Sequence, residues 1–314
     1  MKKMLFTLVL VFTLTLLVTG TALADNGPHG GFTLTTDACA SCHRTHTATG
    51  PKLLTGAGYL ICTACHGQTG TGADTNVIDG VYTARDLTTE SPVEGVPGRG
   101  LLAGGFGAAL MDTNLDTTVG SVTTTSSHIY TGTTGTVWSY GPISATVNNG
   151  QASTALSCMN CHDPHGKTGT GKTATYRILR GQPTGVTLTA SVEIPDQVAK
   201  TYSIASNTGN YFTQTYAAAQ STGLTNWCSQ CHTRNLTVTG SGSTNSGDAV
   251  FMYRHTTNAA ASVLAPNGLA CTSCHVAHGS SAAMTALANS ASLAGDSALL
   301  RVDNRGVCQS CHNK

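Results

Sequence analysis

Charged and aromatic residues are scarce in this chain. Lys, Arg, Asp and Glu together make up 10% of the 314 residues, and aromatic residues make up 5%. The formal net charge is only +1, so the strongly basic surface that nucleic-acid binding requires is missing. A chain with few aromatic side chains and 36 glycines is also poorly equipped to build an ordinary side-chain core. Something other than side chains is therefore expected to fill much of the interior.

Long hydrophobic runs are also missing, with one exception at the N-terminus. Two lysines precede the apolar run 4–18, and Ala22-Leu23-Ala24 follows it. This order is typical of a secretory signal peptide, so we predict that residues 1–24 are removed on export. A retained membrane anchor is the alternative, although the run is short for a bilayer span. We expect residues 25–314 to form a single exported domain with no membrane span.

No cysteine lies outside one motif, because six copies of Cys-x-x-Cys-His use all twelve cysteines. Two thiols at this spacing can both bind the vinyl groups of one porphyrin, and the adjacent imidazole then binds its iron. A bare cysteine pair also fits a zinc site or a redox disulfide, but a histidine after every pair favours haem. We therefore predict six covalently bound haem c groups. The motif cysteines are Cys39, Cys42, Cys62, Cys65, Cys158, Cys161, Cys228, Cys231, Cys271, Cys274, Cys308 and Cys311, and the proximal ligands are His43, His66, His162, His232, His275 and His312.

Six further histidines match the six expected irons. Three of them follow a motif histidine at the same spacing, in His43-Arg-Thr-His46, His162-Asp-Pro-His165 and His275-Val-Ala-His278. Such a histidine lies on the same side of its own porphyrin, so it is better placed to bind a neighbouring haem. We expect six low-spin bis-histidine sites suited to electron transfer, the alternative at each position being a surface or hydrogen-bonding histidine. The predicted distal ligands are His29, His46, His128, His165, His255 and His278.

The predicted fold class is mostly irregular, with a few short helices and minor β-strands, in a chain wrapped around a row of haems. A haem-free stretch, 67–157, is rich in Thr, Gly and Ser. A short turn is expected at each haem motif, and the repetition is of haem sites rather than of folded modules at a fixed period. We predict strands within 119–125, 131–140 and 186–194 and helices around 211–220 and 282–300.

The motifs and the additional histidines resemble those of extracellular multihaem cytochromes that polymerise into filaments, including hexahaem members similar to outer-membrane cytochrome S. The resemblance implies a continuous row of haems along a head-to-tail filament of copies of the chain. It also implies that an N-terminal histidine of one subunit ligates a haem in the next, a role that by position would fall on His29. The expected location is the cell surface or outside the cell.

Two other functions remain open at this stage. One is a multihaem electron carrier that does not polymerise, in the periplasm or at the outer surface. The other is a multihaem redox enzyme, which needs an iron with an open coordination position. No motif replaces its histidine with lysine, and the histidine count leaves no obvious open iron. We therefore predict an electron-transfer protein rather than an enzyme, with redox partners or extracellular metal oxides as electron acceptors.

Overall fold

The computed structural model includes five complete haem motifs and the first cysteine of the sixth. The described residues are 29, 38–67, 73, 75–82, 100–111, 113, 120–140, 152–165, 178–180, 183, 225, 227–234, 248, 271–285 and 297–309. The signal peptide, His255, Cys311, His312, the predicted strand 186–194 and the predicted helix 211–220 lie outside these residues.

Short helices carry the haem motifs, as the sequence predicts. Three residues of separation bring two cysteines onto one face of a helical turn, so the motif itself favours a helix. At the fourth motif a single turn forms, with Ser229 N donating to Thr225 O at 2.9 Å. The helices are α2 (Ala38–Cys42), α3 (Gly58–His66), α4 (Cys158–Cys161), α6 (Cys271–Cys274) and α7 (Gly306–Gln309), with 3-10 turns η1 (Pro51–Leu53) and η6 (Asp303–Arg305).

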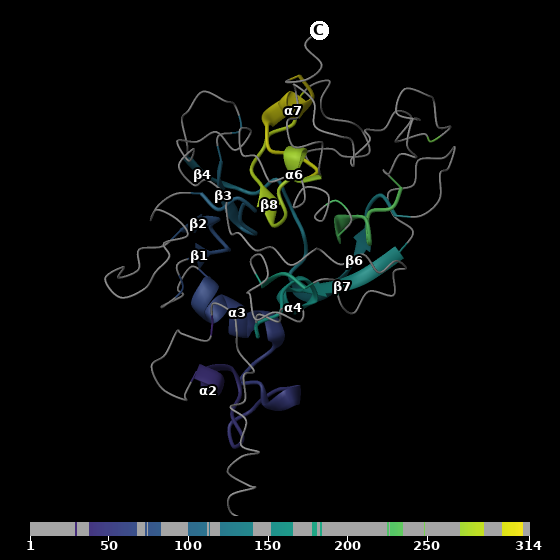
Figure 1. Cartoon of the computed structure of the whole chain (residues 1–314). Coiled ribbons are helices and arrows are strands. Elements are labelled where there is room, and N and C mark those ends of the chain that lie inside the picture. The colour runs from purple at the N-terminus through teal and green to yellow at the C-terminus, as the bar shows by residue number, and fades with distance from the viewer. Residues whose placement is uncertain are drawn as a thin grey trace, which may run out of the picture.

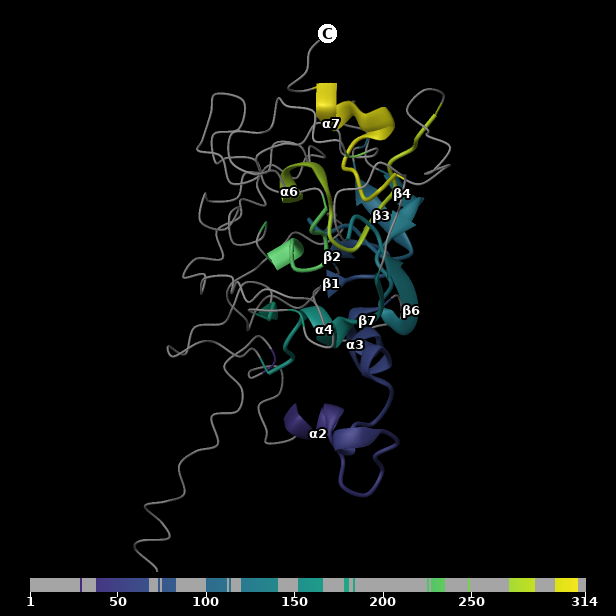
Figure 2. The same cartoon turned by 90° about the vertical axis from the view of Figure 1, so that its right-hand side faces the viewer.

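The motif helices follow one another along one axis in chain order. Figure 1 shows α2 at the lower end, α3 and α4 above it, and α6 and α7 at the upper end. The view at right angles in Figure 2 gives the same order. The first and last haem motifs therefore lie at opposite ends of a column of attachment sites.

Four antiparallel two-stranded sheets support this column. They are β1 (Thr75–Asn76) with β2 (Val81–Tyr82), β3 (Ala108–Met111) with β4 (Gly120–Thr123), β5 (Ser126–Ser127) with β8 (Gly279–Ser280), and β6 (Thr131–Val137) with β7 (Ala152–Ser157). β4 and β6 confirm the strands predicted within 119–125 and 131–140. The β5–β8 pair joins the haem-free stretch to the fifth motif, and His128 N donates to His278 O at 2.9 Å beside it.

Glycines allow two unusually close approaches between segments. At the start of β8, a side chain on Gly279 would collide with the carbonyl of Gly105. At the start of α3, a side chain on Gly58 would overlap the end of the Met159 side chain, which comes from α4. The first contact is between backbones and the second is with a flexible side chain, so the two differ in how much a larger residue would disturb them.

The apolar core of the described residues is small. Its buried cluster consists of Ala109, Met111 and Val276, with Leu102 and Leu299 packed against it. Ala109 and Met111 are the inward-facing residues of β3, in which buried and half-buried residues alternate. This agrees with the expectation that side chains alone supply little of the interior.

The predicted helix around 282–300 is wrong at both of its described ends. Residues 281–285 have no regular structure, and residues 297–300 form a turn and a bridge. Residues of η6 take the backbone groups of this segment: Asn304 N donates at 2.8 Å to Ala283 O, a carbonyl that a helix would use, and Asp303 Oδ1 accepts from Ala283 N at 2.7 Å. Tertiary contacts therefore override the helical propensity of this alanine-rich segment.

Candidate haem centres

The protonated ring nitrogen of six histidines is fixed by a backbone carbonyl. A carbonyl oxygen can only accept, so Nδ1 carries the proton and Nε2 keeps a lone pair with which it could bind a metal ion. Hydrogen bonds of this kind orient metal-bound histidines in general. The partners of Nδ1 are the carbonyls of Pro164 for His29 (2.8 Å), Lys52 for His43 (2.9 Å), Ala277 for His128 (2.6 Å), Trp138 for His232 (2.8 Å), Ala298 for His275 (2.8 Å) and Thr75 for His66 (3.3 Å).

Four pairs of imidazole rings face each other at nearly equal distances. Each pair joins a motif histidine to one of the additional histidines that the sequence singles out. The ring centres are 6.1 Å apart for His43 and His165, 6.1 Å for His66 and His29, 6.2 Å for His162 and His278, and 6.0 Å for His232 and His128.

This spacing fits an iron held between two rings. Two imidazoles that bind one metal from opposite sides each place a nitrogen about 2 Å from it, which leaves their ring centres roughly 6 Å apart. Stacked rings in contact lie closer, as Phe106 and His278 do at 4.6 Å, whereas edge-on rings such as Tyr59 and Tyr130 lie 5.9 Å apart. The distinguishing feature is that each of the four pairs joins a motif histidine to an additional one. The planes of the four histidine pairs meet at angles between 10° and 65°, and each ring is free to turn about its own metal bond. The donor set and its spacing are therefore compatible with bis-histidine haem.

The electrostatic environment keeps one of these pairs neutral. Burial lowers the pKa of His232 to about 4, and the neighbouring His128 acts in the same direction. Burial also lowers the pKa of His128. Neutral imidazole is the form that binds a metal ion, so both rings are in the required state at ordinary pH.

Cysteines of consecutive motifs lie next to one another. Thiols of the second and third motifs form a hydrogen bond, as do thiols of the fourth and fifth. None of the described cysteines is in a disulfide, and nowhere among the described residues do three or more His, Cys, Asp or Glu side chains gather as a metal-binding group. The five described attachment sites thus adjoin in chain order. The adjoining pairs are Cys42 with Cys62, Cys62 with Cys158, Cys161 with Cys231, and Cys228 with Cys271.

The first, third and fifth motifs, named here the paired-histidine sites because a second histidine follows each, share a local structure. At each of them a later stretch of chain comes back and pairs with the motif. These stretches, residues 52–55, 178–180 and 298–301, are named the return segments. The bridges join His43 to Leu54, His162 to Leu179 and His275 to Leu300.

The same two backbone hydrogen bonds hold each return segment. The residue after the motif histidine donates to the residue before the central leucine, and the residue after that leucine donates to the second motif cysteine. One local structure is therefore built three times. The bonds are Arg44 N to Leu53 O (2.8 Å), Thr55 N to Cys42 O (3.0 Å), Asp163 N to Ile178 O (2.7 Å), Arg180 N to Cys161 O (2.9 Å), Val276 N to Leu299 O (2.9 Å) and Arg301 N to Cys274 O (3.0 Å).

The return segments contain residues in the left-handed conformation. The angle φ is 60° and 61° at residues 52–53, 51° and 61° at residues 298–299, and 50° at Ile178. This conformation is unfavourable for residues with a side chain and persists where surrounding contacts enforce it. Here it accompanies the bonds from the imidazoles of His43 and His275 to the carbonyls of residues 52 and 298. The strain is thus located beside the carbonyls that orient these two motif histidines.

An arginine side chain completes each paired-histidine site. Its Nε donates to the carbonyl of the first residue between the two motif cysteines. In the first site the arginine directly follows the motif histidine, whereas in the other two it ends the return segment. The bonds are Arg44 to Ala40 (3.0 Å), Arg180 to Met159 (2.7 Å) and Arg301 to Thr272 (2.8 Å).

The second and fourth motifs, which with the sixth are named the single-histidine sites, are held differently. Nδ1 of His66 also lies 2.7 Å from the Thr75 hydroxyl, at the start of β1. Near the fourth motif, Arg234 forms a bidentate ion pair with Asp248 at 2.8 and 3.2 Å, and both side chains are 0% exposed. A buried pair of this geometry leaves its surroundings without net charge.

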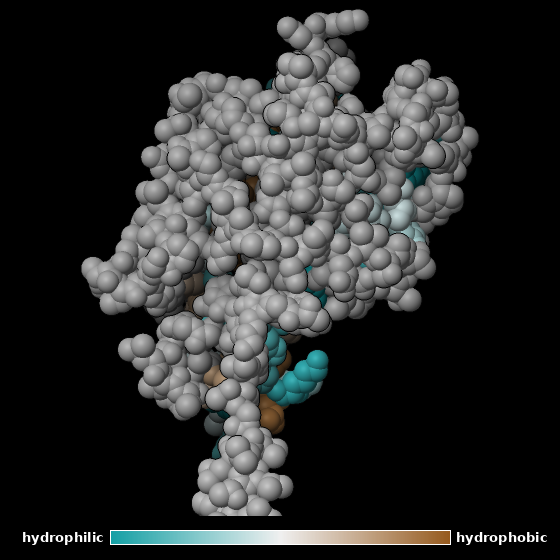
Figure 3. All heavy atoms as spheres, in the orientation of Figure 1, coloured by the Kyte–Doolittle hydropathy of each residue, from teal (hydrophilic) through white to brown (hydrophobic). Residues whose placement is uncertain are grey.

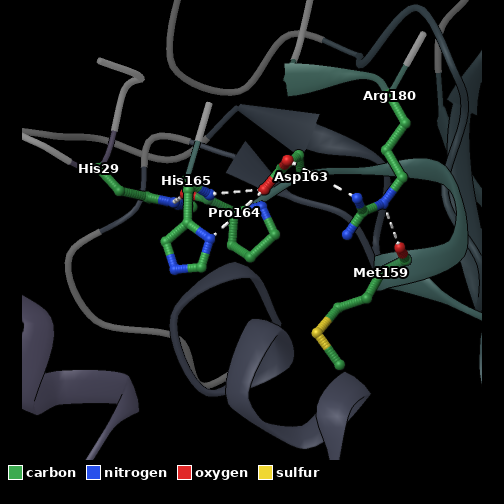
Figure 4. Close-up of polar contacts among 6 residues, drawn as sticks. All are labelled: His29, Met159, Asp163, Pro164, His165 and Arg180. Atoms are coloured by element: carbon green, nitrogen blue, oxygen red, sulfur yellow. Dashed lines mark hydrogen bonds and ion pairs between the residues drawn. The ribbon is translucent and has the colours of Figure 1, made fainter. Parts of the chain in front are cut away.

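His29 reaches the loop that follows the third motif (Figure 4). Its Nδ1 donates to Pro164 O, directly before His165. In the same loop, Asp163 accepts from His165 N at 3.0 Å and lies 3.6 Å from Arg180. His29 is therefore fixed by its own chain, between the second and third motifs.

His128 repeats this arrangement at the fifth motif. Its Nδ1 donates to Ala277 O, directly before His278, just as His29 binds the residue before His165. The His278 ring stacks on Phe106, and its backbone N donates to Ala103 O at 2.8 Å. Two of the additional histidines thus hold corresponding loops.

Among the described histidines, His46 and His275 are in none of these four pairs. His46 is exposed, within the exposed turn 44–47 after the first motif. Cys308 begins the sixth site at α7, whereas Cys311, His312 and His255 lie outside the described residues.

Sequence reasoning missed the return segments and their arginines. The available signal was a short pattern, a hydrophobic residue and a leucine followed by Thr or Arg: Leu53-Leu54-Thr55, Ile178-Leu179-Arg180 and Leu299-Leu300-Arg301. In the first and last cases the next haem motif begins eight residues after the central leucine. Such a pattern becomes meaningful only when it is aligned on the motif histidines.

Comparison with known proteins identifies relatives of this arrangement. A family model described as "Outer membrane cytochrome MtrC/MtrF-like, domains II/IV" matches residues 141–314, and one described as "Doubled CXXCH motif" matches residues 33–71. No curated protein matches the chain. Among solved structures, the "Outer Membrane Cytochrome S Filament from Geobacter Sulfurreducens" is 20% identical with a TM-score of 0.41, and the match covers 88% of this chain and 98% of that one. Among the described residues, no helix is long and apolar enough to cross a membrane.

Proposed function

Because the chain belongs to the MtrC/MtrF-like outer membrane cytochrome family, we propose that it is a hexahaem electron-transfer protein that polymerises head to tail at the cell surface. It is a multihaem c-type cytochrome by its family and by its six motifs. To this family assignment the proposal adds six haems, two histidine ligands for each iron, and assembly of the chain into a head-to-tail polymer. Extracellular metal oxides or partner proteins would receive the electrons.

The chain's own residues suit electron transfer rather than substrate turnover. In each site two cysteines anchor the porphyrin and the motif histidine binds one face of the iron. A second imidazole on the opposite face leaves no position for a substrate. A haem held by these residues would supply one-electron chemistry. The adjoining order of the attachment sites gives those electrons a continuous route.

The distribution of opposite-face ligands is the observation that carries the proposal of a polymer. The first motif is served by His165, which follows the third motif, and the third motif is served by His278, which follows the fifth. Each paired-histidine site thus takes its second ligand from the next such site along the column. The fifth is the last in the chain, so its His275 requires the corresponding histidine of a further copy. That histidine is His46 of the next subunit.

We therefore propose that His46, and not His29, links one subunit to the next. The resemblance to filament-forming cytochromes assigns that role to an N-terminal histidine, and His29 was the expected one. Its ring instead faces His66 of the same chain at 6.1 Å, and its Nδ1 is bound by Pro164. We assign His29 to the second haem and His128 to the fourth. By elimination His255 serves the sixth haem, opposite His312.

The ends of the column suit contact with another copy. At the lower end the turn 44–47 is exposed, and Leu53 and Leu60 are 49% and 51% exposed. Figure 3 shows hydrophilic and hydrophobic residues side by side on the visible surface at this end. His46 follows α2, which lies at this end, and His275 follows α6, which lies near the opposite end, so the two histidines are not neighbours within one chain. A contact of this head-to-tail kind does not close on itself and generates a filament.

Two alanine variants separate the roles of these histidines. For His46→Ala we expect loss of filaments, since the fifth haem has no second ligand from the next subunit. For His29→Ala we expect filaments to persist while one haem within each subunit becomes high-spin. Electron cryomicroscopy of surface filaments and electron paramagnetic resonance of the isolated holoprotein measure the two outcomes.

Each result bears on a different part of the proposal. Filaments that survive His46→Ala with every haem low-spin would remove His46 from the interface. Filaments lost in His29→Ala but retained in His46→Ala would restore the original assignment. The mass of the unmodified holoprotein tests the haem count separately, because it must exceed that of the mature polypeptide by six haems. A low-spin hexahaem protein that forms no filament would be a non-polymeric carrier.

A further inference from the structure

Each paired-histidine site contains an arginine to which the proposed electron transfer gives no role. Arg44, Arg180 and Arg301 come from different places relative to their motifs, yet each donates Nε to the same carbonyl. Arg301 is 1% exposed, the Arg180 side chain is 26% exposed, and Arg44 is exposed. The same hydrogen bond is made by arginines from two different positions relative to the motif, which indicates that a guanidinium is required at this place.

The accepting carbonyl lies inside the haem-attachment loop. It belongs to the residue after the first motif cysteine, so the loop that carries both thioethers and the proximal histidine is held by the bond. A guanidinium remains charged at any ordinary pH, and its charge acts more strongly where water is excluded. A fixed positive charge beside a haem favours the reduced iron, which carries one positive charge less.

The charge of the nearby arginine is offset to a different extent at the fourth, third and fifth motifs. At the fourth motif the nearby Arg234 is bound to the carboxylate of Asp248, and the two charges offset each other. At the third motif Asp163 lies 3.6 Å from Arg180, beside the motif histidine, and offsets part of its charge. The fifth motif has the most deeply buried of the three arginines.

We infer that Arg180 and Arg301 are positioning residues that hold the third and fifth haem-attachment loops and raise the reduction potentials of the haems on those loops, with Arg44 as a weaker counterpart at the first. This rests on the proposed haem occupancy and ligands. Potentials along the row then alternate, higher at the paired-histidine sites than at their neighbours. Electrons would rest preferentially at every second haem.

Spectroelectrochemical titration of the holoprotein tests the effect of charge. For Arg301→Gln we expect one of the haem components to become harder to reduce by about tenfold in its equilibrium constant, or about 59 mV for one electron. For Arg301→Lys we expect a smaller shift, because the charge remains while the fixed geometry is lost. Arg305→Gln is the comparison variant: its arginine is exposed and lies three residues before Cys308 of the sixth motif. Because water and salt screen its charge, any shift should fall on the sixth haem and be much smaller than that for Arg301→Gln.

The opposite outcomes are distinct. Unchanged potentials in Arg301→Gln, or equal shifts for Gln and Lys, would overturn the role of the charge. If Arg301→Gln loses its haem, Arg180→Gln and Arg44→Gln provide the same test at the third and first sites, and unmoved potentials in both would overturn the inference. Asp163→Asn should shift the third haem the other way. Haem mass and low-spin spectra of the unmodified protein report separately on the proposed function.

Discussion

The paired-histidine and single-histidine sites carry the same five-residue motif but are held by different surroundings. In the former, a return segment binds the motif through the same backbone hydrogen bonds at each of three places. In the latter, the second motif relies on Thr75. The fourth has part of the same arrangement, with His232 Nδ1 donating to Trp138 O and Arg234 N to Ser139 O, but no described contact reaches the carbonyl of its second cysteine. The motif is sufficient to attach a porphyrin, whereas the surrounding chain decides how firmly its ligands are oriented.

The opposite-face ligands make the largest expected difference between the two kinds of site. We expect His278→Ala to lower the free energy of unfolding of the holoprotein by about 4 kcal/mol, as loss of a long-range cross-link does. His29→Ala should cost about 1 kcal/mol less, because more than a hundred residues separate His278 from His162 and fewer than forty separate His29 from His66. Denaturant titration of both variants measures this, and a larger loss for His29→Ala would reverse the comparison.

Removal of a carboxylate should lower the free energy of unfolding more at the fourth motif, a single-histidine site, than at the third, a paired-histidine site. Asp248→Asn leaves the buried Arg234 without its ionic partner, at a cost of about 3 kcal/mol. Asp163→Asn at the third motif should cost about 1 kcal/mol, because Arg180 is partly exposed and the amide oxygen still accepts from His165 N. Thermal and denaturant unfolding of the two holoproteins gives the difference. Equal losses of unfolding free energy in the two variants would mean that burial of the Arg234–Asp248 ion pair does not increase the cost of removing its carboxylate.

Two glycines allow the packing around the sites to be compared. Gly279→Ala would press a methyl group on the backbone carbonyl of Gly105 and against the Thr124 and Ser127 side chains, so we expect a loss of about 2 kcal/mol. Gly58→Ala would meet only the end of Met159, which can move, and should change stability by less than about 1 kcal/mol. Hydrogen exchange at β8 and at α3 would locate each effect. Strong local loosening at α3 in Gly58→Ala would show that Met159 is held rigidly.

Helix capping gives the smallest expected contrast. Ser157 and Asn160 bond to each other at the start of α4, with Asn160 Oδ1 accepting from Ser157 N at 2.7 Å. Asn160→Ala should therefore lose about 1 kcal/mol. Ala57 at the start of α3 has no side-chain cap, so Ala57→Ser should gain up to about 1 kcal/mol. Unfolding midpoints that move in the same direction for both would contradict this assignment.

The sequence alone was most informative where covalent chemistry dictates structure. Cys-x-x-Cys-His requires a helical turn, and the equal number of additional histidines pointed to the rings that face the motif histidines. Pairings such as His43 with His165 could not be predicted, because they join residues more than a hundred positions apart. The helix predicted around 282–300 was wrong because Asp303 and Asn304 bind the backbone that propensity assigns to a helix.

The fit between Gly58 and Met159 bears on how the chain avoids misassembly. Three similar return segments give a folding chain more than one way to dock a loop, and an exchange with another molecule is a known hazard of such designs. The residue equivalent to Met159 is Ala40 in the first motif and Thr272 in the fifth, and neither is long enough to fill the same space. Of these three residues, Met159 alone can fill the space beside Gly58, so docking of the third motif against α3 should be more stable than docking of the first or the fifth there.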